Sequence, residues 1–178
     1  MPEQPLVYTP YVRTLWVLAF LSIGLVHAPD LRAEDELAHW EGRVELPKKT
    51  LIRSKEGEKK LRNSHHLTLQ WLDGDKKNRG NLAVEETGGR IVLRGQQTHP
   101  ETGDSIKLVG VVETVDDRAL TFVGRIVTKV SYIADGVACT REGRMTFRIS
   151  GKRKYWRLKE NNNPCSEVTD YVDLHFAD

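Results

Sequence analysis

Apolar and polar residues alternate along most of the chain after Glu34, in short segments separated by turn residues. Alternation with a period of two places every second side chain on the same face, as in a half-buried β-strand. The sequence therefore predicts an all-β fold. The charged segment 48–63 departs from the pattern, and we expect another hairpin there, turning at Glu56-Gly57, or a loose excursion. The expected strands cover residues 39–46, 66–72, 81–87, 90–97, 105–115, 119–131, 144–150, 153–160 and 171–176.

Short turns between these segments predict which strands are neighbours. Gly88-Gly89 can adopt the positive φ angles of a two-residue hairpin turn, and residues 101–104 and 116–118 have turn compositions. Such connections join antiparallel neighbours, so the strands form a meander. Because an open sheet would expose two unpaired edges, we expect the meander to close into an up-and-down barrel of about eight or nine strands. A two-sheet β-sandwich is the alternative.

A tryptophan, Trp40, lies on the first expected strand in Trp40-Glu41-Gly42, ahead of the meander and a pair of cysteines. With these features, residues 39–176 resemble the calycin-like barrels, which include lipocalins and avidins, and the small exported barrels that inhibit proteases or lysozyme. The resemblance implies a barrel that binds a ligand or another protein. Ala38 stands two positions before Trp40, so the lipocalin G-x-W order is absent and no binding residues are carried over.

A continuous apolar run precedes the strand pattern: residues 14–28 (TLWVLAFLSIGLVHA) follow Arg13. As a helix this run would span about 22 Å, at about 1.5 Å per residue, which is less than the roughly 30 Å hydrocarbon core of a bilayer. We therefore expect residues 1–33 to be a cleaved export signal rather than an anchor. Residues 34–178 are then expected to be one periplasmic or secreted domain without a transmembrane span.

The net charge and the motifs of the sequence do not favour nucleic-acid binding or catalysis. The chain has 27 Lys and Arg residues against 25 Asp and Glu residues, a net charge of +2, which is too small to predict nucleic-acid binding. The sequence contains no phosphate-binding glycine loop, zinc-binding pattern or nucleophile elbow. We therefore expect a binding protein without a cofactor or metal rather than an enzyme.

The two cysteines, Cys139 and Cys165, lie in the part expected to be exported. An even number of cysteines in such a protein indicates a structural disulfide. A bridge that closes a loop of about 26 residues would contribute about 3 to 4 kcal/mol in the chain-entropy treatment. We expect this bridge to affect stability rather than chemistry.

The expected hairpin over 144–160 has two different faces. A two-residue turn at Ser150-Gly151 would place Arg148 opposite Arg153, and strand alternation then assigns each side chain to a face. The same register places Arg144 opposite Arg157. The apolar face, expected in the core, holds Met145, Phe147, Ile149, Trp156 and Leu158. The other face holds the residues that we assign to ligand or partner binding: Arg144, Arg148, Arg153, Tyr155 and Arg157.

Directly opposed arginines are unfavourable in a sheet unless something anionic lies between them. Arginine forks bind carboxylate, sulfate or phosphate groups, and Tyr155 could stack on a sugar ring. The hypothesis is a binding face for an anionic glycan, a lipid head group or an acidic protein surface. The alternative is a solvated face whose arginines pair with Glu142, Glu160 or acids on neighbouring strands.

Other residues have two interpretations. Trp40, Trp71 and Trp156 could line a cavity for a small apolar ligand inside the barrel, or could pack in its core. Asp173 and His175 share a face of the last expected strand with Tyr171, but the sequence shows no third metal ligand and no catalytic partner beside them. The leading hypothesis is an exported, lipocalin-like binding protein for such a ligand or for an anionic partner. An exported inhibitor or envelope interaction module is the alternative, and an enzyme whose site assembles from distant residues comes third.

Overall fold

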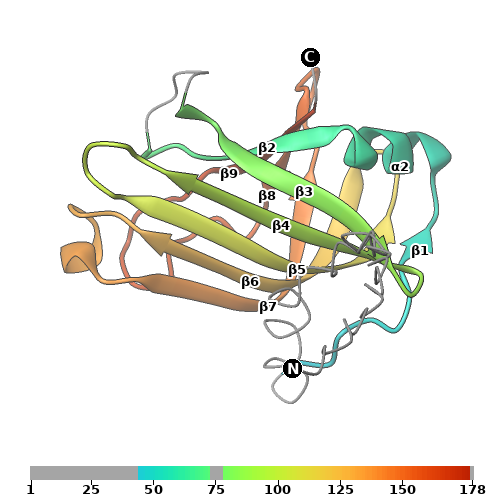
Figure 1. Ribbon diagram of the computed structural model, residues 1–178, viewed down its shortest axis with the longest axis horizontal. Helices are drawn as coiled ribbons and strands as arrows, with labels where there is room; N and C mark the ends of the chain where they lie inside the picture. The colour runs from blue at the N-terminus through green and yellow to red at the C-terminus, as the bar shows by residue number, and fades with distance from the viewer. Residues whose placement is uncertain (1–43, 73–77, 177–178) are drawn as a thin grey trace, which may run out of the picture. The chain divides into compact units, whose positions relative to one another are not determined.

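The computed structural model describes residues 44–72 and 78–176, which form a closed β-barrel (Figure 1). Each barrel strand pairs antiparallel with the next one along the chain, and the last pairs with the first. This confirms the predicted all-β, up-and-down barrel. The strands are β2 (Ser64–Leu69), β3 (Gly80–Thr87), β4 (Arg90–Thr98), β5 (Ser105–Val115), β6 (Ala119–Lys129), β7 (Cys139–Arg148), β8 (Tyr155–Leu158) and β9 (Val172–Phe176).

Two elements precede the barrel within the described residues, and they correct the expectation for 48–63. The short strand β1 (Leu51–Ile52) pairs in parallel with the end of β5, and the helix α2 (Lys55–Arg62) follows it. The segment is therefore neither a hairpin nor a loose loop. Ser54 is the N-cap of α2, because its side chain accepts a hydrogen bond from the Gly57 backbone N–H at 3.1 Å. Leu61 anchors the helix in the barrel core.

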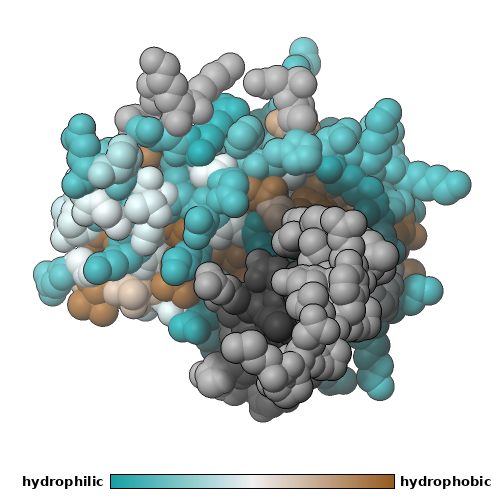
Figure 2. All heavy atoms as spheres, in the orientation of Figure 1, coloured by the Kyte–Doolittle hydropathy of each residue, from teal (hydrophilic) through white to brown (hydrophobic). Residues whose placement is uncertain are grey.

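Side chains from alternate strand positions fill the barrel interior. Trp156, Phe122 and Phe147 are fully buried, and the two phenylalanine rings meet edge to face at 6.0 Å. The paired glycines Gly110 and Gly124 leave room for the Phe122 ring, since a Cβ on either would approach that ring to 2.6 Å or less. The core is thus packed side chain against side chain, which favours core packing over cavity lining for Trp156. Figure 2 shows the outer surface, and hydrophilic residues predominate among the described residues on the face in view.

Most predicted turns agree with the pairing. Thr87 pairs with Arg90 across Gly88-Gly89, and both glycines have positive φ angles. Residues 44–46, the described part of the expected first strand, are not a strand. The rest of that strand, with Trp40 and the expected export signal, lies outside the described residues. Within 44–72 and 78–176, no helix is long and apolar enough to cross a membrane.

The connection between β8 and β9 lies at the barrel end opposite α2 (Figure 1). The predicted disulfide joins Cys165 in this connection to Cys139 at the start of β7, with the two Cα atoms 5.9 Å apart. Asp170, fully buried, accepts hydrogen bonds from Arg141 on β7 at 2.6 Å and from Trp71 after β2 at 2.8 Å. A 3-10 turn, η2 (Ala134–Gly136), lies in the β6–β7 connection at the same end.

Candidate functional site

The outer surface of β7, β8 and β9 holds most of the predicted binding residues. Met145 and Phe147 on β7, and Trp156 and Leu158 on β8, are buried, as alternation predicted for the inner face. Arg148 and Arg153 are exposed, whereas Tyr155 and Arg157 are half-buried. The assignment of side chains to the two faces is therefore correct.

The predicted register of the β7–β8 hairpin is wrong by four residues. Arg148 lies opposite Arg157, not Arg153, because the turn spans 149–154 rather than Ser150-Gly151 alone. Arg118 explains the longer turn: its carbonyl accepts a hydrogen bond from the Ile149 N–H, and its guanidinium donates to the Gly151 carbonyl at 2.6 Å. These contacts hold the start of the turn against the β5–β6 turn and away from β8. A shift of four is even, so every side chain keeps its face.

Arg157 pairs with an acid on a neighbouring strand, as the alternative of a solvated face expected, and that acid is Asp173. Its guanidinium donates two hydrogen bonds, each 2.7 Å long, to the two oxygens of Asp173 on β9. Asp173 is mostly buried, and its hydrogen bonds raise the pKa of Arg157 above the ordinary value. Strand alternation and barrel closure together would have placed Asp173 on the outer face beside β8, so the signal was present in the sequence.

Two tyrosines flank the Arg157 guanidinium. The guanidinium carbon lies 4.2 Å from the centre of the Tyr171 ring and 5.2 Å from that of Tyr155. Arg153 approaches the same Tyr155 ring to 5.6 Å. These distances fall in the range of cation–π contacts. We name these four residues and Arg148 the Arg/Tyr face.

Arg148 and Arg153 have no acidic partner within the described residues. The ion pairs found there do not include either guanidinium, and three lysines nearby in sequence are exposed as well: Lys152, Lys154 and Lys159. Of the acids considered as partners, Glu142 pairs with Arg125 instead, and Glu160 accepts a hydrogen bond from the Thr146 N–H. The Arg/Tyr face therefore combines one neutralised arginine with two arginines that are free to bind an anion.

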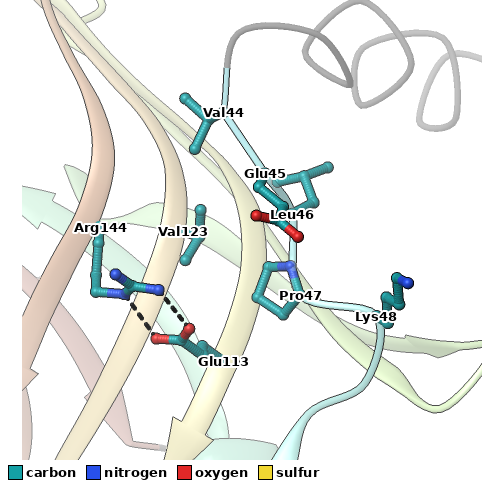
Figure 3. Close-up of a pocket in the computed structure, with 8 residues that line it drawn as sticks. All are labelled: Val44, Glu45, Leu46, Pro47, Lys48, Glu113, Val123 and Arg144. Atoms are coloured by element: carbon teal, nitrogen blue, oxygen red, sulfur yellow. Dashed lines mark hydrogen bonds and ion pairs between the residues drawn. The ribbon is translucent and has the colours of Figure 1, made fainter.

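Arg144, the fifth residue predicted to bind a ligand or partner, lies apart from this face. It forms a two-bond ion pair with Glu113 on β5, at 2.6 and 2.8 Å, and its hydrogen bonds lower the pKa of Glu113. Figure 3 shows the pair on one side of a groove of about 650 Å³, with residues 44–48 on the other and Val123 between them. The structure thus brings four of the five predicted residues near one another and leaves Arg144 in a different environment.

Asp173 and His175 lie beside the Arg/Tyr face, in contact with Arg157 and Tyr155 respectively. The His175 ring packs against Tyr155, with centroids 5.2 Å apart, and its Nε2 lies 2.8 Å from the Thr68 hydroxyl. Burial, and next the positive charge of Arg79, lower the pKa of His175 from its ordinary value of 6.5. No group of three metal-ligating side chains occurs among the residues that the structure describes.

Comparisons with known proteins place the chain in a family. Residues 49–176 match the PM1083 family, so the match runs from just before β1 to the end of β9. Uncharacterized protein PM1083 of Pasteurella multocida (strain Pm70) is 40% identical over 119 residues, which cover 67% of this chain and 75% of that protein. No solved structure matches, and neither comparison points to a calycin-like family, so the expected resemblance extends to the barrel architecture alone. The chain belongs to the PM1083 family.

Proposed function

We propose that this chain is a non-enzymatic binding protein that recognises an anionic partner through the Arg/Tyr face. The observation that carries the proposal is the unequal pairing of two opposed arginines. Asp173 neutralises Arg157, whereas Arg148 directly opposite is exposed and has no acidic partner in the described residues. Opposed like charges in a sheet are stabilised when an anion binds between or beside them.

Rigid positioning of the face supports this function. Arg157 is fixed by two hydrogen bonds to Asp173 and by the Tyr155 and Tyr171 rings, so little side-chain entropy remains to be lost when a partner binds beside it. Free arginine forks next to this fixed group can then bind carboxylate, sulfate or phosphate oxygens in pairs.

Binding of a small apolar ligand inside the barrel has weaker support. Such a ligand would have to displace packed core side chains such as Phe122 and Trp156, which are fully buried. Leu61 of α2 packs into the core near one end, and the Asp170 network with the disulfide closes the other. We therefore favour the outer face over the interior as the place of binding.

Export is part of the proposal. The apolar run at residues 14–28 has the length of a signal-peptide core, and the Cys139–Cys165 disulfide suits an oxidising compartment. Mass spectrometry of the protein purified from its native host should therefore give a chain that starts at Glu34. A cytosolic chain that retains residues 1–33 would contradict export and leave the binding proposal intact.

Titration with inorganic polyphosphate tests anion binding directly. Arg148→Glu with Arg153→Glu should weaken binding at least tenfold, because two attractive charges become repulsive. Lys107→Glu with Lys129→Glu, at exposed positions on β5 and β6, makes the same change of net charge and should weaken binding much less. Equal losses in the two double variants, or no binding by the unsubstituted protein, would contradict the proposal. Unchanged unfolding temperatures would show that the variants are folded.

A further inference from the structure

Tyr171 is an exposed aromatic residue immediately before β9, and its backbone is fixed by hydrogen bonds. It is 39% exposed, although the Arg157 guanidinium packs over its ring, with the guanidinium carbon 4.2 Å from the ring centre. Gln70 fixes the backbone: its N–H donates to the Tyr171 carbonyl, and its side-chain oxygen accepts from the Tyr171 N–H, each at 3.2 Å. The Gln70 side-chain amide also donates to the Thr169 carbonyl at 2.9 Å. Hydrogen bonds with Gln70 therefore fix the backbone at Tyr171, and the Arg157 guanidinium contacts its ring.

The Arg/Tyr face has an alternating order that matches a particular kind of anion. Arg153, Tyr155, Arg157 and Tyr171 form a continuous series of ring and guanidinium contacts. Along this series the exposed Tyr171 ring lies at one end and Arg153, which has no acidic partner among the described residues, at the other, with Arg148 opposite Arg157. The groups of this face that remain for a ligand are the exposed Tyr171 ring and the guanidinium groups of Arg148 and Arg153. A matching ligand must therefore offer a flat apolar face together with anionic oxygens.

We infer that the ligand of the Arg/Tyr face is an acidic polysaccharide whose sugar rings carry carboxylates. This inference rests on the proposed function, because it names the class of anion. One sugar ring stacks on Tyr171, and the carboxylates of the chain bind the forks of Arg148 and Arg153. Arg157 does not bind the ligand's charge, because Asp173 already occupies its fork. Its role is to hold the two tyrosine rings.

An anionic membrane surface fits the same face less well. Side chains that bind a bilayer combine positive charge with apolar groups that enter the acyl region. The large exposed apolar residues in the described part of the chain, apart from Tyr171, are Leu51, Tyr132 and Val137. None of these three belongs to β7, β8 or β9, so the face offers charge and a fixed ring without an aliphatic side chain to insert.

Parallel titrations with four probes test the inference: polygalacturonate, its fully methyl-esterified form, inorganic polyphosphate and phosphatidylglycerol vesicles. Tyr171→Ala should weaken polygalacturonate binding at least fivefold and leave polyphosphate binding within twofold, because polyphosphate has no ring to stack. Tyr171→Phe should bind polygalacturonate normally. Tyr132→Ala is the control, since Tyr132 is a 67% exposed tyrosine in the β6–β7 connection, outside the Arg/Tyr face, and this variant should bind both probes normally. The methyl ester should bind at least tenfold more weakly than the acid.

These titrations distinguish binding of an acidic polysaccharide from binding of anions in general. If polyphosphate binds through Arg148 and Arg153 but Tyr171→Ala leaves polygalacturonate binding unchanged, the acidic polysaccharide is wrong and anion binding stands. If no probe binds, both are wrong. Stronger binding to phosphatidylglycerol vesicles than to polygalacturonate would replace the polysaccharide with a membrane surface.

Discussion

Arg148 lies directly opposite Arg157 in the β7–β8 ladder, and only Arg157 has a carboxylate partner in the described part of the chain. Two positive side chains at paired positions repel each other, and a single Asp173 on the next strand neutralises one of them. The remaining charge on Arg148 is exposed beside a fixed guanidinium and two tyrosine rings. This relationship makes the outer face of β7 to β9 the strongest binding candidate in the described residues.

Asp173→Asn should show two separate effects of the carboxylate, one on stability and one on anion binding. Without it Arg157 loses its ion pair in a half-buried position, so the free energy of unfolding should fall by about 1 to 3 kcal/mol. The released guanidinium should also strengthen polyphosphate binding. Asp117→Asn removes an exposed partner of Lys60 and should change stability by less than about 0.5 kcal/mol. Denaturant unfolding and polyphosphate titration measure the two effects, and unchanged affinity in Asp173→Asn would count against the Arg/Tyr face.

Replacing one partner of the buried ion pair Arg141–Asp170 should strongly lower the free energy of unfolding. Both side chains are at least nine-tenths buried, and the carboxylate of Asp170 also accepts hydrogen bonds from Trp71 and Asn163. Asp170→Asn would leave the Arg141 charge uncompensated and should destabilise the protein by about 3 to 5 kcal/mol. Adding Arg141→Met removes that charge and should restore part of the loss. Denaturant unfolding of the single and double variants measures this, and a double variant less stable than Asp170→Asn would refute the explanation.

The disulfide should stabilise the barrel without taking part in binding. It closes a loop of 26 residues, so Cys139→Ala with Cys165→Ala should lower the free energy of unfolding by about 3 to 4 kcal/mol. A reducing agent should lower the unfolding temperature of the unsubstituted protein and leave that of the alanine variant unchanged. Polyphosphate affinity, measured well below the unfolding temperature, should be the same in both.

His175 should make the stability of the protein depend on pH. Burial and the charge of Arg79 lower its pKa in the folded state below the ordinary 6.5, so the unfolded chain takes up a proton first as the pH falls. The stability associated with neutral His175 is therefore fully present above pH 6.5 and is lost between 6.5 and the folded pKa. Unfolding free energies measured from pH 7.5 to 5 should decline less in His175→Gln than in the unsubstituted protein. His65→Gln, at an exposed position, should decline like the unsubstituted protein.

The barrel could be predicted because its turns are local. Gly88-Gly89 determines one hairpin by itself, and the alternation of apolar residues determines the inner face of each strand. The helix α2 was missed because Glu56-Gly57 suggested a turn, although Ser54 and the charges of the segment have the order of a capped helix: acids first, then bases. The β7–β8 register depends on Arg118, which is distant in sequence, so no local pattern in the hairpin could have given it.

The site was only partly predictable for a similar reason. Alternation identified the outer arginines and Tyr155, whereas Asp173, Tyr171 and Gln70 act through contacts across strands that are far apart along the chain. Their roles depend on barrel closure between β9 and β2 and on the β8–β9 pairing. Sequence alone placed Asp173 and His175 on one face but could not show which neighbours occupied their polar atoms.

The most direct test is an NMR titration of the isotope-labelled protein with inorganic polyphosphate, observing backbone amides and arginine Nε–H groups. We predict the largest shifts at Arg148 and Arg153, smaller ones at Tyr155 and Tyr171, and little change at Lys107 and Lys129. Shifts that are concentrated away from the residues of the Arg/Tyr face, or that are equally small at every basic residue, would contradict recognition of an anion by the Arg/Tyr face.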